Sequence, residues 1–176
     1  MTGTHLVVVD MQRVFADPGS PWATPGFAAI LPTVADLAKR FGDAVTFTRF
    51  VAPDRPTGAW RDYYAEWPFA LQPSDAPLWD IVPSLNAGAA TVDATTFSKW
   101  GAALAERMGD AEMVLCGVST DCCVLSTAVA AADAGVPVRV VGDACAGVSA
   151  ESHRATLGVL ALYEPLVRVV SSADLS

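Results

Sequence analysis

The hydrophobic residues of this chain fall into short apolar runs that alternate with amphipathic or alanine-rich segments. The runs are of the length and composition of strands buried on both faces, and they lie at residues 6–9, 44–50, 90–93, 113–118, 136–143 and 166–171. The intervening helices are expected at residues 27–41, from about 100 to 109, 122–135 and 151–163. In the first of these, Ile30, Val34 and Leu37 share one face.

Strands that alternate with helices predict an α/β fold with a parallel sheet covered on both faces. We expect a three-layer αβα domain spanning residues 1–176, with a doubly wound, six-stranded, Rossmann-like sheet in the order 3-2-1-4-5-6. Residues 51–87 interrupt the alternation with several prolines and many aromatic residues. An irregular insert of this length indicates a lid or binding loop.

The segment from Glu112 to Gly135 carries the most informative local pattern. A buried strand is followed by the turn Gly117-Val-Ser-Thr-Asp121, and then by an alanine-rich helix that ends at Gly135. Cys122 and Cys123 therefore fall at a helix start beyond a strand end, where amide N–H groups and the helix dipole favour a thiolate and an oxyanion. A buried cysteine more commonly packs as a small hydrophobe, and this is our interpretation of Cys116. Cys145 follows another strand end, and the same interpretation holds there with less force.

Asp10 lies at the carboxyl end of the first predicted strand, and the turn after Asp93 lies at the carboxyl end of the third predicted strand. Sites in doubly wound folds lie at the carboxyl ends of the strands, so both positions face the same edge as the Cys122/Cys123 turn. The pattern alone does not decide the role of Asp10. The residue is equally well explained as a cap of the next turn and as a functional carboxylate.

Three segments resemble the isochorismatase-like cysteine hydrolases, a family that includes nicotinamidases and small-amide and lactam hydrolases. They are Leu-Val-Val-Val-Asp-Met-Gln-Arg-Val-Phe at 6–15, Val-Asp-Ala-Thr-Thr-Phe-Ser-Lys-Trp at 92–100 and Gly-Val-Ser-Thr-Asp-Cys-Cys-Val at 117–124. The resemblance implies that Cys123 is the nucleophile and Asp10 the base that takes the thiol proton. It also implies an oxyanion hole at the N–H groups of Ser119 and Cys123, with a cis peptide bond before Ser119.

The family's catalytic lysine falls on Ala94 when its motif is laid on this chain, and Lys99 stands five residues further on. We interpret Lys99 as a solvated residue in the first turn of the next helix, and the site as lacking its lysine. Without that ammonium group the thiolate would be less populated, so we expect low activity.

The pocket is expected to be lined by Phe15, Trp60, Tyr64 and Trp67, which suits a flat or apolar substrate. The family's metal-binding members carry histidines after the second strand. Here that region has none, and the chain has only His5 and His153. We therefore expect no metal and no cofactor, and we interpret His153 as a core or hydrogen-bonded residue.

Composition narrows the class of protein further. The net charge of −8 on 176 residues, without a basic run, argues against nucleic acid or an anionic membrane as a partner. Four cysteines match neither a disulfide framework nor a zinc pattern. No signal-like segment precedes residue 6 and no stretch is of membrane-spanning length, so we expect a cytoplasmic protein.

These observations predict a hydrolase that cleaves the C–N bond of a small amide or lactam through a thioester on Cys123. Two alternatives remain open at this point: hydrolysis of an isochorismate-like vinyl ether, and a non-catalytic protein that only binds a small molecule. The resemblance also implies a homo-oligomer.

Overall fold

The computed structural model of the chain describes residues 3–85 and 90–175. Its strands form one parallel sheet in the order β3-β2-β1-β4-β5-β6, as predicted. The strands are β1 (Thr4–Val9), β2 (Val45–Phe50), β3 (Ala90–Ala94), β4 (Glu112–Val118), β5 (Val138–Ala146) and β6 (Val167–Val170). The helices are α1 (Arg13–Ala16), α2 (Phe27–Phe41), α3 (Trp60–Glu66), α4 (Ala102–Met108), α5 (Leu125–Asp133) and α6 (Ala150–Leu160).

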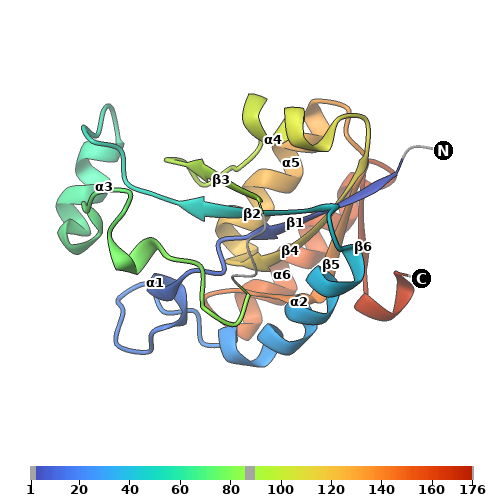
Figure 1. Cartoon of the computed structure of the whole chain (residues 1–176), viewed down its shortest axis with the longest axis horizontal. Helices are drawn as coiled ribbons and strands as arrows, with labels where there is room; N and C mark the ends of the chain where they lie inside the picture. The colour runs from blue at the N-terminus through green and yellow to red at the C-terminus, as the bar shows by residue number, and fades with distance from the viewer. Residues whose placement is uncertain (1–2, 86–89, 176) are drawn as a thin grey trace.

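Helices cover both faces of this sheet (Figure 1). Helix α2 packs against β1, β4 and β5, and it buries Phe27, Ile30, Val34 and Leu37 on that side. Helices α4 and α5 lie on the opposite face, and α5 also contacts α6. Because β1 and β4 are central and covered on both faces, their side chains from Leu6 to Val9 and from Met113 to Val118 are buried, which explains why these segments are apolar without alternation.

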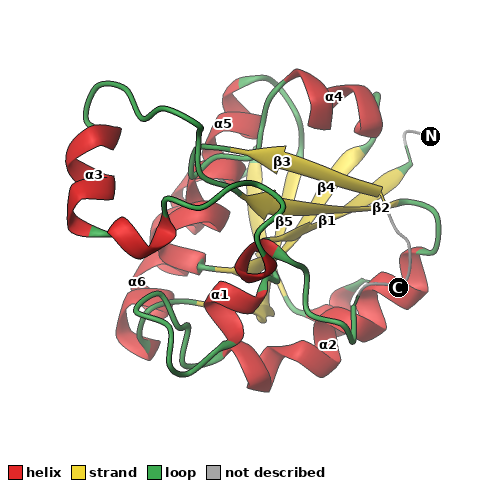
Figure 2. Cartoon of the chain, turned by 60° about the vertical axis from the view of Figure 1, so that its left-hand side comes forward, coloured by secondary structure: helices red, strands yellow, loops and turns green. Residues whose placement is uncertain are grey.

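The insert at residues 51–87 is more ordered than the sequence indicates. It contains α3 and two short 3₁₀ turns, at Pro68–Ala70 and Pro77–Trp79, while its last two positions, 86 and 87, lie outside the described residues. The helix α3 stands beyond the carboxyl ends of the strands (Figure 2). The insert is therefore placed to cover the edge of the sheet where a site is expected.

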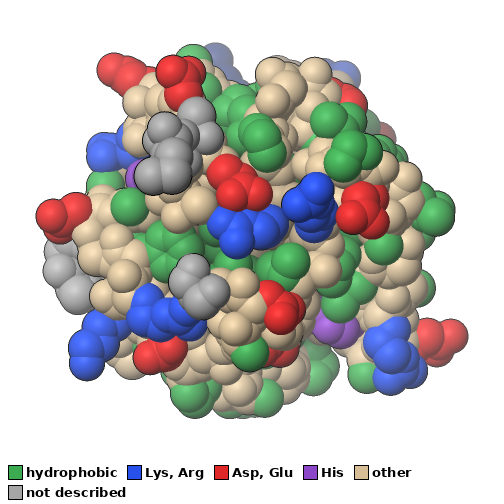
Figure 3. Space-filling model, turned by 90° about the vertical axis from the view of Figure 1, so that its right-hand side faces the viewer, with side chains coloured by type: hydrophobic (Ala, Val, Ile, Leu, Met, Phe, Trp, Pro, Cys, Tyr) green, Lys and Arg blue, Asp and Glu red, His purple; other side chains and the backbone are tan. Residues whose placement is uncertain are grey.

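The opposite end of the molecule, toward which the amino ends of the strands point, shows acidic and basic side chains intermixed with apolar surface (Figure 3). Within the described residues, no helix has both the length and the apolar character needed to cross a membrane.

Strands β1 and β4 approach each other closely at their carboxyl ends, where Val9 pairs with Gly117. Gly117 has a φ of 113°, and a Cβ atom there would lie 2.1 Å from the carbonyl oxygen of Val9. Only glycine fits this conformation and this approach. The contact fixes the distance between the residue that follows β1, Asp10, and the turn that follows β4.

We therefore expect Gly117→Ala to lower the free energy of unfolding by about 3 kcal/mol or more, because backbone atoms on both strands must move apart. Urea denaturation measures this change. Gly158→Ala is the matched control: its Cβ would meet nothing within 4 Å in α6, so it should stabilise the protein by up to about 1 kcal/mol. Equal stability of Gly117→Ala and the unmodified chain would contradict the proposed close approach.

Candidate active site

Asp10 lies directly after β1 with its side chain fully buried. Its φ of 50° is unusual for a residue other than glycine and turns the chain sharply out of the sheet. One carboxylate oxygen, Oδ1, accepts a 2.8 Å hydrogen bond from the hydroxyl of Thr48 on β2. A buried carboxylate requires such partners, and above all an opposite charge.

That charge comes from Lys99, whose Nζ lies 2.9 Å from Oδ2 of Asp10. The side chains of both residues are 0% exposed. The ammonium group also donates to the carbonyl oxygen of Thr96 at 2.9 Å and lies 4.8 Å from the centroid of the Phe50 ring. The interpretation of Lys99 as a solvated surface residue is therefore wrong, and the site does contain a lysine.

The local chain path explains the error. Strand β3 ends at Ala94, whose carbonyl oxygen accepts from the N–H of Val51, and α4 begins only at Ala102. Between them the chain turns back on itself, with the hydroxyl of Thr96 bonded to the carbonyl of Ser98 at 2.8 Å. Lys99 thus belongs to this turn rather than to a helix, and it is directed inward, while Ala94 contributes no charge.

The turn after β4 carries Cys122 and Cys123, and α5 follows it. The peptide bond between Val118 and Ser119 is cis, as expected, and residues Thr120–Val124 form one π-helical turn before α5. Cys123 is 4% exposed. Its carbonyl accepts from the hydroxyl of Thr127 at 2.6 Å, and the same hydroxyl accepts from the backbone N–H of Lys99 at 2.9 Å. The hydroxyl of Thr127 therefore connects the turn that carries Lys99 to the turn that carries Cys123.

The protonation of Cys123 differs from the expectation that a helix start favours its thiolate. Burial raises the pKa of the thiol well above its usual value, the charge of Asp10 and a hydrogen bond to it raise the pKa further, and only Lys99 lowers it. Desolvation therefore outweighs the lysine and the turn. The site therefore holds a buried thiol of raised pKa that is hydrogen-bonded to the Asp10 carboxyl group.

Cys123 opens onto a cavity of about 300 Å³, which we call the aromatic cavity. Six aromatic side chains line it together with Pro21, Ala23, Val148, Ser119 and the two adjacent thiols, and these aromatic residues are Phe15, Trp22, Phe50, Tyr63, Trp67 and Phe97. Asp10 and Lys99 do not line it, because they are buried behind the thiol. The size suits a small substrate.

Two of the four predicted pocket residues lie at this cavity. Phe15 and Trp67 line the aromatic cavity, but Trp60 and Tyr64 do not; Tyr64 is 3% exposed and packs in the core. Tyr63 takes the expected place of its neighbour, since adjacent residues of a helix point in different directions.

Sequence reasoning missed Trp22, which lies in the loop between α1 and α2. Its ring stacks on Phe15 at 6.1 Å and meets Phe50 edge-on at 5.7 Å. Two residues further along the same loop, the Thr24 hydroxyl lies 3.3 Å from that of Ser119. The sequence signal that could have identified Trp22 is its position between two prolines in a polar loop.

Cys116 and Cys145 are buried, and burial raises the pKa of both thiols, that of Cys145 to about 12. The histidines lie outside the site. His5 bonds the hydroxyl of Thr46, and His153, as predicted, is hydrogen-bonded, to Thr120. Among the described residues, no cluster of three histidine, cysteine or carboxylate side chains could hold a metal ion.

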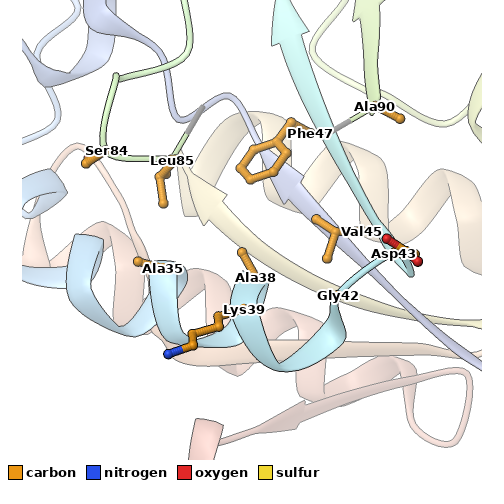
Figure 4. A pocket seen from close by; sticks show the side chains of 10 residues that line it. All are labelled: Ala35, Ala38, Lys39, Gly42, Asp43, Val45, Phe47, Ser84, Leu85 and Ala90. Atoms are coloured by element: carbon orange, nitrogen blue, oxygen red, sulfur yellow. The ribbon is translucent and has the colours of Figure 1, made fainter. Parts of the chain in front are cut away.

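A second cavity, of about 440 Å³, lies among α2, the start of β2 and the start of β3 (Figure 4). Its described lining includes Lys39 and Asp43 with small and apolar side chains, but neither a thiol nor an imidazole. The aromatic cavity, onto which Cys123 opens, is therefore the candidate active site.

The Asp10–Lys99 pair should show strong energetic coupling. We expect Lys99→Met to lower the free energy of unfolding by about 3–5 kcal/mol, because it leaves a buried carboxylate without its counter-ion. Asp10→Asn/Lys99→Met should be less destabilising than the sum of its two single changes, as measured by urea denaturation in a double-mutant cycle. Additive effects would show that the two charges do not interact.

Comparison with known proteins shows similarity over most of the chain. The chain is 29% identical over 175 residues to the nicotinamidase/pyrazinamidase of Mycobacterium tuberculosis, covering 86% of this chain and 91% of that protein. An isochorismatase family protein from Desulfovibrio vulgaris superposes with a TM-score of 0.85 at 23% identity, covering 99% and 97% of the two chains. A cysteine hydrolase from Pseudomonas syringae pv. phaseolicola gives 0.82 at 23%, covering 98% and 90%. The isochorismatase domain model matches residues 4–174, and the chain therefore belongs to the isochorismatase family of hydrolases.

Proposed function

We propose that this protein hydrolyses the C–N bond of a small amide or lactam through a thioester on Cys123. The observation that carries the proposal is the convergence of three groups at one end of the aromatic cavity: a neutral, buried thiol, a carboxylate able to take its proton, and a lysine paired with that carboxylate. The similarity to a nicotinamidase/pyrazinamidase supports the same bond type.

The first half of the reaction begins when Asp10 accepts the thiol proton of Cys123 and the sulfur attacks the substrate carbonyl carbon. The positive charge of Lys99 stabilises the thiolate as it forms. Backbone N–H groups of Ser119 and Cys123 are the proposed donors to the oxyanion. The C–N bond then breaks, the nitrogen takes the proton held by Asp10, and an acyl-Cys123 thioester forms. From an open amide the amine or ammonia departs, whereas from a lactam the amine stays attached to the acyl chain.

The second half restores the thiol. Water attacks the thioester carbonyl while Asp10 takes one of its protons, the C–S bond breaks, and the proton returns to the sulfur as the carboxylic acid departs. Asp10 therefore acts twice, as base and then as acid in each half. Every step uses residues of this chain, and the overall reaction consumes one amide and one water.

With Lys99 in the site, the earlier expectation of a lysine-deficient, low-activity form loses its basis. So does the non-catalytic interpretation, which depended on Ala94. We propose instead that position 99 supplies the catalytic lysine in this chain.

Exchange of the two positions tests this assignment. Lys99→Met should lower kcat/KM on a primary amide by about 10²–10³, by analogy with the loss of one oxyanion donor. Ala94→Lys alone should not raise the rate, and Ala94→Lys/Lys99→Met should not recover it. Circular dichroism on each variant controls for folding. Recovery of normal rates in the double variant would show that the lysine can act from position 94 and that its site at 99 is not required.

The thioester is tested by acid quench during turnover, followed by peptide mass spectrometry. We expect a mass increase equal to the acyl group on the peptide that carries Cys123, and Cys123→Ser should lower kcat by about 10³ or more. Cys145→Ala, which changes a buried thiol outside the cavity, is the matched control and should retain both activity and adduct. Full activity in Cys123→Ser would contradict covalent catalysis.

A further inference from the structure

Ser119 lies directly after β4, at a position where a serine ordinarily caps the helical turn that follows. A capping serine side chain accepts a hydrogen bond from a backbone N–H in that turn. The Ser119 side chain accepts no such bond, although the residue occupies the N-cap position of the π-helical turn at Thr120–Val124. Its carbonyl oxygen accepts instead, from the N–H groups of Cys122 and Val124 at 3.1 Å each. The hydroxyl therefore has a role other than capping.

The hydroxyl of Ser119 is held by one hydrogen bond, to the hydroxyl of Thr24 at 3.3 Å. Thr24 is 4% exposed, and among the described residues its hydroxyl has no other hydrogen-bond partner. Because a buried hydroxyl proton needs an acceptor, Thr24 donates this bond and Ser119 accepts it. The reverse direction would leave the Thr24 proton without an acceptor. The hydroxyl proton of Ser119 is then available to a third group.

The aromatic cavity is the place from which such a group can reach Ser119. Ser119 lines this cavity together with Cys123, whereas Thr24 does not line it. Since Ser119 is 8% exposed, its hydroxyl is largely shielded from bulk water. In the proposed mechanism, the negative charge that develops beside Cys123 is the oxyanion formed when the sulfur adds to the carbonyl carbon. A hydroxyl donor next to the thiol can make a strong, charge-assisted hydrogen bond to that oxygen.

From these contacts we infer that the Ser119 hydroxyl is a third donor to the oxyanion, beside the backbone N–H groups of Ser119 and Cys123, and that Thr24 is the residue that positions it. This inference rests on the proposed function and adds a catalytic side chain to it. The backbone of Thr24 is fixed on both sides, because its N–H donates to the carbonyl of Phe15 at 2.9 Å and its carbonyl accepts from the N–H of Phe27 at 3.0 Å. By donating to the Ser119 oxygen, Thr24 also strengthens the Ser119 O–H as a donor.

An aldehyde isolates this interaction, because its addition to a thiol forms a tetrahedral centre without a leaving group. The sulfur of Cys123 bonds to the aldehyde carbon, the π electrons of the C=O bond move to the oxygen, and Asp10 takes the thiol proton. The resulting adduct resembles the tetrahedral intermediate of amide hydrolysis. An amide bound to the Cys123→Ala variant stays trigonal and serves as the reference.

The test measures two affinities by calorimetry, each with and without Ser119→Ala: that of benzaldehyde for the otherwise unmodified protein, and that of benzamide for Cys123→Ala. We expect Ser119→Ala to weaken benzaldehyde binding by about 10- to 100-fold, the effect of one hydrogen bond to a charged group. Benzamide binding should weaken by less than about threefold, because the donor acts on the tetrahedral state. Ser171→Ala, which removes a serine hydroxyl bonded to Asp174 at 2.8 Å outside the cavity, is the matched control and should leave both affinities unchanged.

Unchanged benzaldehyde affinity in a folded Ser119→Ala variant overturns the inference. An equal loss of affinity for benzaldehyde and benzamide also overturns it, because the hydroxyl would then not distinguish the tetrahedral state from the trigonal one. Failure of the proposed function looks different. Benzaldehyde would bind Cys123→Ala as tightly as the unmodified protein, since no adduct forms on the thiol, and the inference would fall with the function.

Thr24→Val tests the positioning role, because valine keeps the shape of threonine without its hydroxyl. It should weaken benzaldehyde binding by about two- to tenfold, the effect of one neutral hydrogen bond, but should have no effect when Ser119→Ala is already present. Thr24→Ser should keep the affinity of the unmodified protein. A loss of the same size in both backgrounds would show that Thr24 is only a structural contact and would overturn its positioning role. Circular dichroism on each variant controls for folding.

Discussion

The buried ion pair between Asp10 and Lys99 is the interaction on which the rest of the site depends. Removing two charges from water costs several kcal/mol for each ion, and their attraction offsets this only when the geometry is good and the remaining polar atoms are bonded. Each ion has one further partner here, since the Thr48 hydroxyl donates to Oδ1 of Asp10 and the ammonium group of Lys99 donates to the carbonyl of Thr96. The ion pair fixes the position of the carboxyl end of β1 relative to the turn that follows β3. It also places both charges behind Cys123.

Neutral contacts hold these ends in register. Gly117 permits β1 and β4 to approach where a side chain would collide with Val9. Thr127 links the backbone of Lys99 to that of Cys123 through one hydroxyl. Gln12, fully buried, bonds both backbone groups of Phe50 and the carbonyl of Trp79, and so attaches the aromatic insert to the sheet. Positions that look like ordinary polar residues in the sequence thus set the geometry of the site.

The sequence predicts the sheet, its order and α2 because buried strands and amphipathic helices leave periodic patterns. It also indicates Asp10, directly after β1, and the Cys122/Cys123 turn after β4 as candidate site positions, while the choice of Cys123 comes from the family resemblance. It fails at Lys99 and Trp22, because their places depend on how irregular segments fold back. A lysine is solvated by default, and only the position of Asp10 in three dimensions gives this one a reason to be buried. The four-residue α1 is too short to leave a pattern.

Charge balance connects the ion pair to the character of the cavity. In the proposed mechanism, the site holds one carboxylate, one ammonium and a neutral thiol before proton transfer, and a neutral acid, the same ammonium and a thiolate afterwards. The net charge is zero in both states, so the buried site moves a proton without bringing in a counter-ion. Burial that raises the pKa of Cys123 is tolerable because Lys99 remains beside the sulfur when it ionises. The apolar walls of the aromatic cavity thus surround a set of reacting groups whose charges balance among themselves.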